Sequence, residues 1–345
     1  MPDQKVFRLP SKGAGVDALQ ETTEPIPKAQ AHEVVLKIHA STLNFRDLVI
    51  ATGLYPFPVK DNAVPLSDAA GTIEEVGPGV FGFENGDFAI ANFDPTNQFG
   101  PQRDWENALG GPVDGVCRPY VALPASCIVK IPKNYEAIMA PARRSRTTAW
   151  NALYGNLPLK AGQTVLFQGT GGVSMTGLML AKAAGAKTII TSSSDEKLKF
   201  AREKYGADFT INYKKTPKWG EAALELTNGQ GVDYVFENGG AGTIAESIKC
   251  VARGGQIAVI GFLAQIDQKD MPDVAALVLD KGCIVRGINV GAKQLTEDMV
   301  QLVCSKDLAM PIDKTYKFEL QEIKAAYKEL SKAGHVGKIA IHIQR

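Results

Sequence analysis

The stretch that decides the fold is Val165-Leu-Phe-Gln-Gly169-Thr-Gly171-Gly172-Val-Ser-Met-Thr-Gly177. Its apolar start predicts a buried strand, and the residues after Gly172 predict a helix. Gly169 allows a tight turn, while Gly171 and Gly172 let a pyrophosphate approach the backbone. The helix directs its N-terminal amides at that phosphate. The turn therefore predicts a dinucleotide site formed by Gly169, Thr170, Gly171, Gly172 and Val173.

Ser174 stands where the G-x-G-x-x-G pattern has its third glycine, so the surrounding sequence must support the assignment. Strands and helical stretches alternate from Thr164 onward. This alternation predicts a parallel sheet with helices on both faces, and six strands complete one doubly wound Rossmann domain. The expected strands are Thr164–Gln168, Lys187–Ser192, Phe209–Tyr213, Asp233–Glu237, Gln256–Gly261 and Ile284–Val290.

The first 130 residues are β-rich, with short alternating runs such as Glu33–His39 and Gly71–Val76. The polar stretch Asn92–Val116 predicts a surface loop. The tail, with strands expected around Lys314–Phe318 and Lys338–Ile343, can return to complete the first domain. We therefore expect an α/β protein with a β-rich domain at 1–130 and 299–345 and a doubly wound nucleotide-binding domain at 131–298.

Composition narrows the class of protein. The 345 residues are 45% hydrophobic, and 38 basic residues nearly balance 37 acidic ones, which argues against nucleic acid or an anionic membrane as partner. No apolar run is long enough to span a bilayer, and the N-terminus lacks the apolar core of a secretory signal. Five scattered cysteines without a CxxC pair favour structural thiols in a reducing compartment. We expect a cytoplasmic protein.

The end of the second strand bears on the choice of cofactor. An NAD site places a carboxylate there to hold the ribose hydroxyls, whereas this chain has Ser192 and Ser193, which can donate hydrogen bonds to a 2′-phosphate. Lys197 and Arg202 can add positive charge. We therefore predict NADPH, although a strand end shifted by one or two residues would place Asp195 on the ribose.

Further motifs, taken in order, resemble the medium-chain dehydrogenase/reductase superfamily over nearly the full length. The resemblance implies a GroES-like substrate domain, a Rossmann NADP-binding domain, a small-molecule substrate and a homodimer paired through the last Rossmann strand. Its motifs are Leu43-Asn-Phe-Arg-Asp47, Gly53-Leu-Tyr-Pro56, Pro65-Leu-Ser-Asp-Ala-Ala-Gly71, Glu75-Val-Gly-Pro-Gly79 and Gly334-His-Val-Gly-Lys338.

Zinc alcohol dehydrogenases of this superfamily bind catalytic zinc through positions that align with Asn44, Ser67 and Arg144, none of them a Cys or His. The region that usually carries a structural-zinc lobe, 90–115, has no cysteine. The resemblance therefore implies a zinc-independent quinone oxidoreductase or enoyl reductase, and Leu43–Asp47 resembles the enoyl-reductase branch. A metal-free carbonyl reductase or alcohol dehydrogenase, and a non-catalytic NADPH-binding redox sensor, are the alternatives.

Three residues are candidates for catalysis. Tyr55 matches a tyrosine that some enoyl reductases use as proton donor, although it can equally cap a turn. Asn44 matches a position near the nicotinamide and can donate to a carbonyl oxygen, or else it satisfies turn backbone. Arg144 could polarise a carbonyl or hold a carboxylate, or else begin a solvated basic helix with Arg143 and Arg146. The neighbours Arg46 and Asp47 suggest a structural ion pair.

The remaining cofactor contacts follow from the resemblance alone, and each of these residues could instead simply end a strand or begin a helix. They are Thr148, Tyr213, Asn238, Gly239, Gly261, Phe262, Asn289, Val290 and Lys338.

Overall fold

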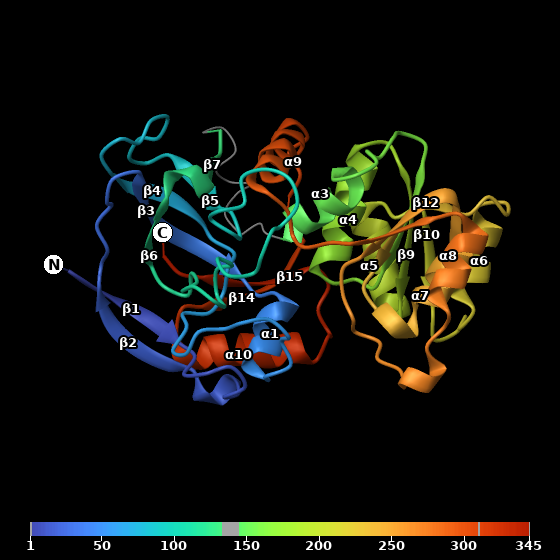
Figure 1. The fold of residues 1–345 in the computed structure, drawn as a ribbon, viewed down its shortest axis with the longest axis horizontal. Coiled ribbons are helices and arrows are strands. Elements are labelled where there is room, and N and C mark those ends of the chain that lie inside the picture. The colour runs from blue at the N-terminus through green and yellow to red at the C-terminus, as the bar shows by residue number, and fades with distance from the viewer. Residues whose placement is uncertain (1, 133–144, 310, 345) are drawn as a thin grey trace. The chain divides into compact units, whose positions relative to one another are not determined.

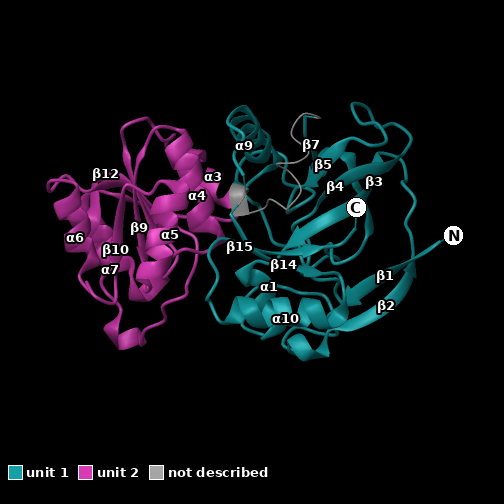
Figure 2. Cartoon of the chain, turned by 180° about the vertical axis from the view of Figure 1, so that it is seen from behind, with its two compact units in different colours: residues 1–147, 291–345 teal, residues 148–290 magenta. Residues whose placement is uncertain are grey.

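The computed structural model describes residues 2–132, 145–309 and 311–344, without the side chains of Ser145 and Arg146. The chain divides into two compact units, drawn in different colours in Figure 2. Unit 1 comprises residues 1–147 and 291–345, and unit 2 comprises residues 148–290.

Unit 2 contains a six-stranded parallel sheet with the order β10-β9-β8-β11-β12-β13 (Figure 1). This is the doubly wound Rossmann arrangement that the sequence predicts. The first two strands have the predicted bounds, whereas the last ends at Gly287 and not at Val290. The strands are β8 Thr164–Gln168, β9 Lys187–Ser192, β10 Phe209–Asn212, β11 Val232–Glu237, β12 Val251–Val259 and β13 Ile284–Gly287.

The helices of unit 2 form two groups beside this sheet. Helices α4 and α5 contact each other and the strands β8 to β10, while α6, α7 and α8 contact one another in sequence. In Figure 1 the two groups lie on opposite sides of the strands. The helices are α3 Ser145–Tyr154, which begins in unit 1, α4 Gly172–Ala183, α5 Asp195–Tyr205, α6 Trp219–Leu226, α7 Ile244–Cys250 and α8 Val274–Lys281, with 3-10 turns η4 Gly240–Gly242 and η5 Gln268–Asp270.

Unit 1 is built on a seven-stranded sheet with the path β14-β15-β3-β4-β5-β7, and β6 also pairs with β3. A separate hairpin-like pair, β1 with β2, completes its strands. The strands are β1 Asp3–Arg8, β2 Gln20–Pro25, β3 Glu33–Thr42, β4 Ala70–Val76, β5 Phe88–Ala91, β6 Tyr120–Pro124, β7 Ile128–Lys130, β14 Ile312–Lys317 and β15 Lys338–His342. The helices are η1 Val16–Ala18, α1 Phe45–Ala51, η2 Ala125–Cys127, α9 Lys293–Ser305 and α10 Leu320–Ser331.

The C-terminal segment returns to the N-terminal sheet, as the alternating tail predicts. Strand β15 pairs antiparallel with β3, joining Ala340 to Thr42. Helix α10 buries Ile323 and Tyr327 in the same apolar core as residues of β3 and β15. The two segments of unit 1 therefore share one core.

The stretch Asn92–Val116 is only in part the surface loop that its polarity predicts, because most of its middle is exposed, with Phe99 73% exposed, while both ends are buried. Asn92, Phe93, Leu109 and Val116 are all buried. The buried backbone is satisfied locally, because the Leu109 amide donates to the Phe93 carbonyl and the Asn92 side chain donates to the carbonyls of Asp94 and Asn97. Polar side chains here bond the chain to itself, which allows the two ends of a turn-rich segment to be buried.

Gly177 sets how closely α4 approaches the sheet. A Cβ at this position would lie 2.6 Å from the Phe167 ring of β8 and 2.7 Å from the Phe236 ring of β11. Both rings are fully buried and packed together, so neither can move aside easily. Gly177 thus performs the close helix–strand packing that the third glycine of the motif usually allows.

We expect Gly177→Val to destabilise the protein by about 1–3 kcal/mol, the usual cost of overpacking a core. Thermal and urea unfolding measure this loss. Gly171→Ala is the matched control, because a Cβ there meets no atom within 4 Å and the substitution should leave unfolding unchanged. Equal stability of the Gly177→Val variant and the unsubstituted protein would contradict this account of the packing.

Candidate functional site

The glycine turn lies where the strand order of the parallel sheet reverses, between β8 and β11. Ligands of doubly wound sheets bind at the carboxyl ends of the strands at this point. Gly169 has a φ of +73°, a backbone conformation that favours glycine, and Gly171 precedes α4 without any side-chain cap. A Cβ at Gly169 or Gly171 would meet no protein atom within 4 Å. The open backbone and uncapped helix fit a pyrophosphate.

Ser174 contributes to this turn although it replaces a glycine. Its hydroxyl donates to the Gln168 carbonyl at 2.7 Å and accepts from Asn238 Nδ2 at 2.9 Å. Asn238 Nδ2 also donates to the Gln168 carbonyl at 2.8 Å. The end of β11 is therefore tied directly to the start of the glycine turn.

A buried carboxylate organises the adjoining loop. Glu237, which is 0% exposed, accepts at one oxygen from the amides of Gly239 and Gly240, both at 2.8 Å, and from the Thr243 hydroxyl. Its other oxygen accepts from Gln168 Nε2 at 2.8 Å and from the Ser247 hydroxyl. Five donors compensate the burial of this charge. Nothing local in the sequence shows that Glu237, Gln168 and Ser247 meet, so these residues are not predicted as part of the site.

The predicted 2′-phosphate residues gather at the carboxyl end of β9. Ser192 is the last residue of that strand, its backbone oxygen accepts from the Tyr213 amide at 3.1 Å, and Lys197 lies in the first turn of α5. Ser193 lies between them and is half-buried. Asp195 follows the strand end, and its carboxylate accepts from Asn212 Nδ2 at 2.7 Å and from Lys215 Nζ. These bonds lower its pKa, Asn212 contributing most.

The other predicted cofactor residues of unit 2 lie either in the loops after β11 and β12 or in α3 and the last residues of the unit. Gly239, Gly261 and Phe262 belong to loops that are hydrogen-bonded together, since the Leu263 amide donates to Asn238 and the Gly261 amide to Glu237. Thr148 is half-buried in α3, and Asn289 is exposed near the end of unit 2. Val290 has a φ of +49° and accepts from Asn151 Nδ2 at 2.9 Å.

In unit 1 the structure brings Asn44 and Lys338 together across 294 positions of sequence. Lys338 Nζ donates to Asn44 Oδ1 at 2.7 Å and pairs with Asp68 Oδ2 at 3.3 Å. The Asp68 carboxylate also accepts from the Thr42 hydroxyl at 2.5 Å. Because an ammonium has only donors, Asn44 must present its oxygen to Lys338, which turns its NH2 group away.

Tyr55 is buried and lies beside Arg46, for which the sequence suggests Asp47 as the partner. Arg46 Nε donates to Tyr55 Oη at 3.0 Å, and Arg46 Nη1 donates to the Leu109 carbonyl at 2.8 Å. Arg46 therefore does not form the expected ion pair with Asp47. The reason is helical geometry, because adjacent helix positions point in different directions.

Asp47 instead caps its own helix. Its Oδ2 accepts from the Asn44 amide at 2.7 Å, while its buried Oδ1 has no hydrogen-bond partner among the described residues. Burial raises the pKa of Asp47 to about 6, and the nearby Asp68 adds to the rise. Arg46, the Asn44 amide and Lys338 oppose it.

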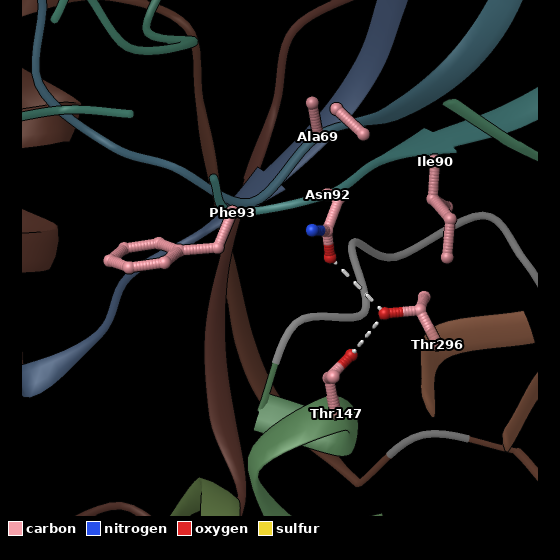
Figure 3. Close-up of a pocket in the computed structure, with 7 residues that line it drawn as sticks. Ala69, Ile90, Asn92, Phe93, Thr147 and Thr296 are labelled. Carbon is pink, nitrogen blue, oxygen red and sulfur yellow. Dashed lines mark hydrogen bonds between the residues drawn. The ribbon is translucent and has the colours of Figure 1, made fainter. Parts of the chain in front are cut away.

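A small pocket in unit 1 carries a chain of polar groups (Figure 3). The Thr147 and Thr296 hydroxyls are 3.0 Å apart, and the Thr296 hydroxyl donates to Asn92 Oδ1 at 3.3 Å. These groups can orient a hydrogen-bonding ligand against an otherwise apolar wall formed by Ala69, Ile90, Ala91 and Phe93. The sequence does not predict this group of residues, because only the fold brings them together.

The described residues do not fit a catalytic zinc site. Asn44 and Ser67 are residues that the resemblance places at zinc-ligand positions, but Asn44 Oδ1 already accepts from the Lys338 ammonium group. Within residues 2–132, 145–309 and 311–344, no three His, Cys, Asp or Glu side chains lie close enough to share a metal ion. Arg144, the third aligned residue, and its neighbour Arg143 lie outside the described residues, as does the side chain of Arg146.

All five cysteines are buried and none forms a disulfide. Among the helices of the described part of the chain, none has the length and apolar character needed to cross a membrane.

Two family models match the chain. Residues 30–133 match the alcohol dehydrogenase GroES-like domain, and residues 172–305 match the zinc-binding dehydrogenase model. A zinc-type alcohol dehydrogenase-like protein of Schizosaccharomyces pombe is 42% identical over 338 residues, 96% of each chain. An acryloyl-coenzyme A reductase of Sulfurisphaera tokodaii is 28% identical over 330 residues, covering 92% of this chain and 94% of the relative. A crystal structure of a putative alcohol dehydrogenase from Sinorhizobium meliloti 1021 superposes with a TM-score of 0.85 at 35% identity, covering 99% and 100% of the two chains.

The raised pKa of Asp47 predicts a specific pH dependence of stability. Its pKa is about 6 in the folded protein and ordinarily 3.8, so the native state favours the protonated form. The stabilisation is complete below the ordinary value and is lost as pH rises through 6. Relative to Asp47→Asn, the free energy of unfolding of the unsubstituted protein should fall by roughly 3 kcal/mol between about pH 3 and about pH 8.

Urea unfolding at a series of pH values measures this difference. Asp195→Asn is the control with the opposite sign, because the lowered pKa of Asp195 gives a stabilisation that is lost as pH falls. Parallel stability curves for the unsubstituted protein and Asp47→Asn would show that the Asp47 carboxyl is not perturbed.

Proposed function

Because the chain belongs to the medium-chain dehydrogenase/reductase superfamily and is an oxidoreductase of that family, we propose that it is a zinc-independent, NADPH-dependent reductase. Its acceptor is the activated C=C bond of an enone or enoyl compound, or a quinone. Unit 1 is the substrate domain of this proposal and unit 2 the cofactor domain.

One observation carries the proposal: a hydrogen-bonded amide occupies a position that aligns with a zinc ligand. Lys338 Nζ donates to Asn44 Oδ1 and so fixes which way the Asn44 side-chain amide is turned, and in this proposal that oriented amide faces the substrate carbonyl. Reduction of an activated C=C bond places negative charge on that carbonyl oxygen. A fixed donor stabilises the charge, as an oxyanion hole does.

Tyr55 supplies the proton in this proposal. Its hydroxyl lies on the same unit as Asn44, and its ring is buried, which keeps it in one orientation. Proton donation by a positioned side chain contributes typically about 10²–10⁴ in rate. The similarity to an acryloyl-coenzyme A reductase supports an acceptor of the enoyl class.

The cofactor belongs to unit 2. When bound, reduced nicotinamide supplies a hydride. The open glycine turn and the uncapped α4 would hold the pyrophosphate, and Ser192, Ser193 and Lys197 would hold the 2′-phosphate of NADPH. Asp195 supports this choice, because its carboxylate is bonded to Asn212 and Lys215.

We also propose a homodimer paired through β13, which is the last strand at one edge of the sheet of unit 2. Ile284 on this strand is 37% exposed, and an unpaired apolar edge strand favours pairing with another chain.

The main experiment follows NADPH consumption with enones, enoyl thioesters, quinones and aldehydes, with zinc content measured on the same sample. We expect enone or quinone reduction without stoichiometric zinc. Tyr55→Phe should lower enone reduction about 100-fold or more. Tyr120→Phe, a half-buried tyrosine of the same unit, is the matched control and should keep the rate.

Each other result assigns a different function. Reduction of aldehydes alone would favour a metal-free carbonyl reductase. NADPH binding without oxidation by any acceptor would favour a redox sensor. Stoichiometric zinc that the activity requires would reject the proposal.

The choice of NADPH is tested with Ser192→Asp. A carboxylate at the end of β9 repels the 2′-phosphate and can hold ribose hydroxyls, so kcat/KM with NADPH should fall about ten-fold or more relative to NADH. Ser331→Asp adds the same charge on α10 and should change neither value. A natural preference for NADH would reject this part of the proposal.

A further inference from the structure

The Arg46 guanidinium makes two hydrogen bonds and lies close to two aromatic rings. Its Nε donates to Tyr55 Oη, and its Nη1 donates to the carbonyl of Leu109. Its central carbon lies 5.0 Å from the centre of the Tyr55 ring and 4.9 Å from that of Phe93, distances at which a cation is attracted to an aromatic face. Its Nη2 packs against Gly111.

Local structure brings Arg46 and Tyr55 together. Arg46 lies in the first turn of α1, and the chain turns back after that helix at Gly53, whose φ is +83°. The Tyr55 amide then donates to the carbonyl of Val49 in the same helix at 3.1 Å. The two side chains are thus fixed by one short segment.

The direction of the Arg46–Tyr55 hydrogen bond has a chemical consequence. A guanidinium has only donors, so Tyr55 Oη must be the acceptor. The hydroxyl proton of Tyr55 is therefore not used in this bond and must point elsewhere. The bond fixes the position of the oxygen while leaving its proton available for transfer.

We propose that Arg46 is the positioning residue for Tyr55: it holds the phenol oxygen, directs the hydroxyl proton away from itself and stabilises the charge left after proton transfer. This inference rests on the proposed reduction of an activated C=C bond. It adds Arg46 and its hydrogen bond to Tyr55, neither of which the proposed function requires.

The proton step balances as follows. Hydride addition at the β-carbon leaves an enolate, whose electron pair forms a new C–H bond at the α-carbon. The Tyr55 O–H bond breaks to supply that proton, and its electrons remain on Oη as a phenolate. Arg46 Nε–H donates to this charged oxygen, and a charged pair makes a stronger hydrogen bond than a neutral one. A proton from water then restores the phenol.

The surroundings of Arg46 strengthen this effect. Tyr55 contacts Phe57, Phe57 stacks on Trp105 at 4.4 Å, and Trp105 contacts Phe93. These rings form an aromatic frame around the guanidinium and limit its contact with water. Charges interact more strongly where water is excluded.

The test uses an enone with an α-methyl group, whose product records the face on which the α-carbon is protonated. With the unsubstituted protein, we expect one α-configuration in excess. Arg46→Met should lower kcat and kcat/KM together about ten-fold or more, the sign of an interaction made in the transition state, and should reduce that excess. A purely structural role for Arg46 would not change the product configuration.

Two further variants sharpen the test. Gly111→Ala displaces the guanidinium through Nη2 and keeps both Arg46 and Tyr55, so it should change the product in the same direction but less. Arg46→Met made in the Tyr55→Phe variant should cost nothing further, since the partner is already gone. Arg253→Met removes an exposed arginine that bonds only a backbone carbonyl, and it should leave rate and product unchanged.

Unchanged rate and product configuration in Arg46→Met, or the same loss in both backgrounds, would overturn the inference while leaving the proposed function intact. If the protein reduces no acceptor, the proposed function fails, and an NMR measurement still decides the geometry. The Nε–H of Arg46 should exchange slowly with water and exchange faster in Tyr55→Phe. An Nε–H signal that Tyr55→Phe does not alter would refute the positioning.

Discussion

Unit 1 depends on the neutralisation of one buried cation. The side chains of Lys338 and Asp68 are 4% and 0% exposed, so each charge has lost most of its water. Such a pair is stable only with close geometry and further hydrogen bonds, and removal of one partner leaves a costly buried charge. Asn44 and Thr42 supply those bonds. The ion pair thereby holds the start of β15 beside the residues that lead into β4.

Lys338 and Arg46 have a common role in this structure. Each is a cation that can only donate, and each holds the oxygen of a neutral polar side chain, Asn44 in one case and Tyr55 in the other. Because the cation binds the oxygen of its partner, it fixes the direction in which the N–H or O–H group of that partner points. Unit 1 therefore carries two oriented polar groups.

The sequence predicts the parts of the fold that depend on local patterns. Strands β8 and β9 alternate with helices, Gly169 follows the end of β8, and β9 ends at Ser192, so their bounds can be read directly from the sequence. The last strand was predicted too long, because apolar residues continue beyond Gly287 after the hydrogen-bonded ladder ends. The polar sequence of 92–116 does not show that its two ends are buried, because the Asn92 side chain there bonds to the backbone of the same segment.

The candidate site shows more clearly that local patterns do not predict contacts between residues distant in sequence. The glycine turn is contiguous in sequence and could be recognised, but the Glu237 network joins residues 69 to 79 positions apart through Gln168. Arg46 was paired with its neighbour Asp47 because adjacency was the only available information, whereas its partners Tyr55 and Leu109 lie across a turn and in a distant segment. Long-range hydrogen bonds leave no periodic signal in the chain.

The return of β15 to β3 also governs the order in which the molecule can be assembled. Unit 2 is one continuous segment, so its six strands are all present once residue 290 has been synthesised. The central sheet of unit 1 lacks β15, and with it Lys338, until the last part of the chain emerges. Contacts between residues distant in sequence form slowly. During synthesis, Asp68 and Asn44 therefore belong to an incomplete sheet until Lys338 is made. The dinucleotide-binding unit can fold before that point.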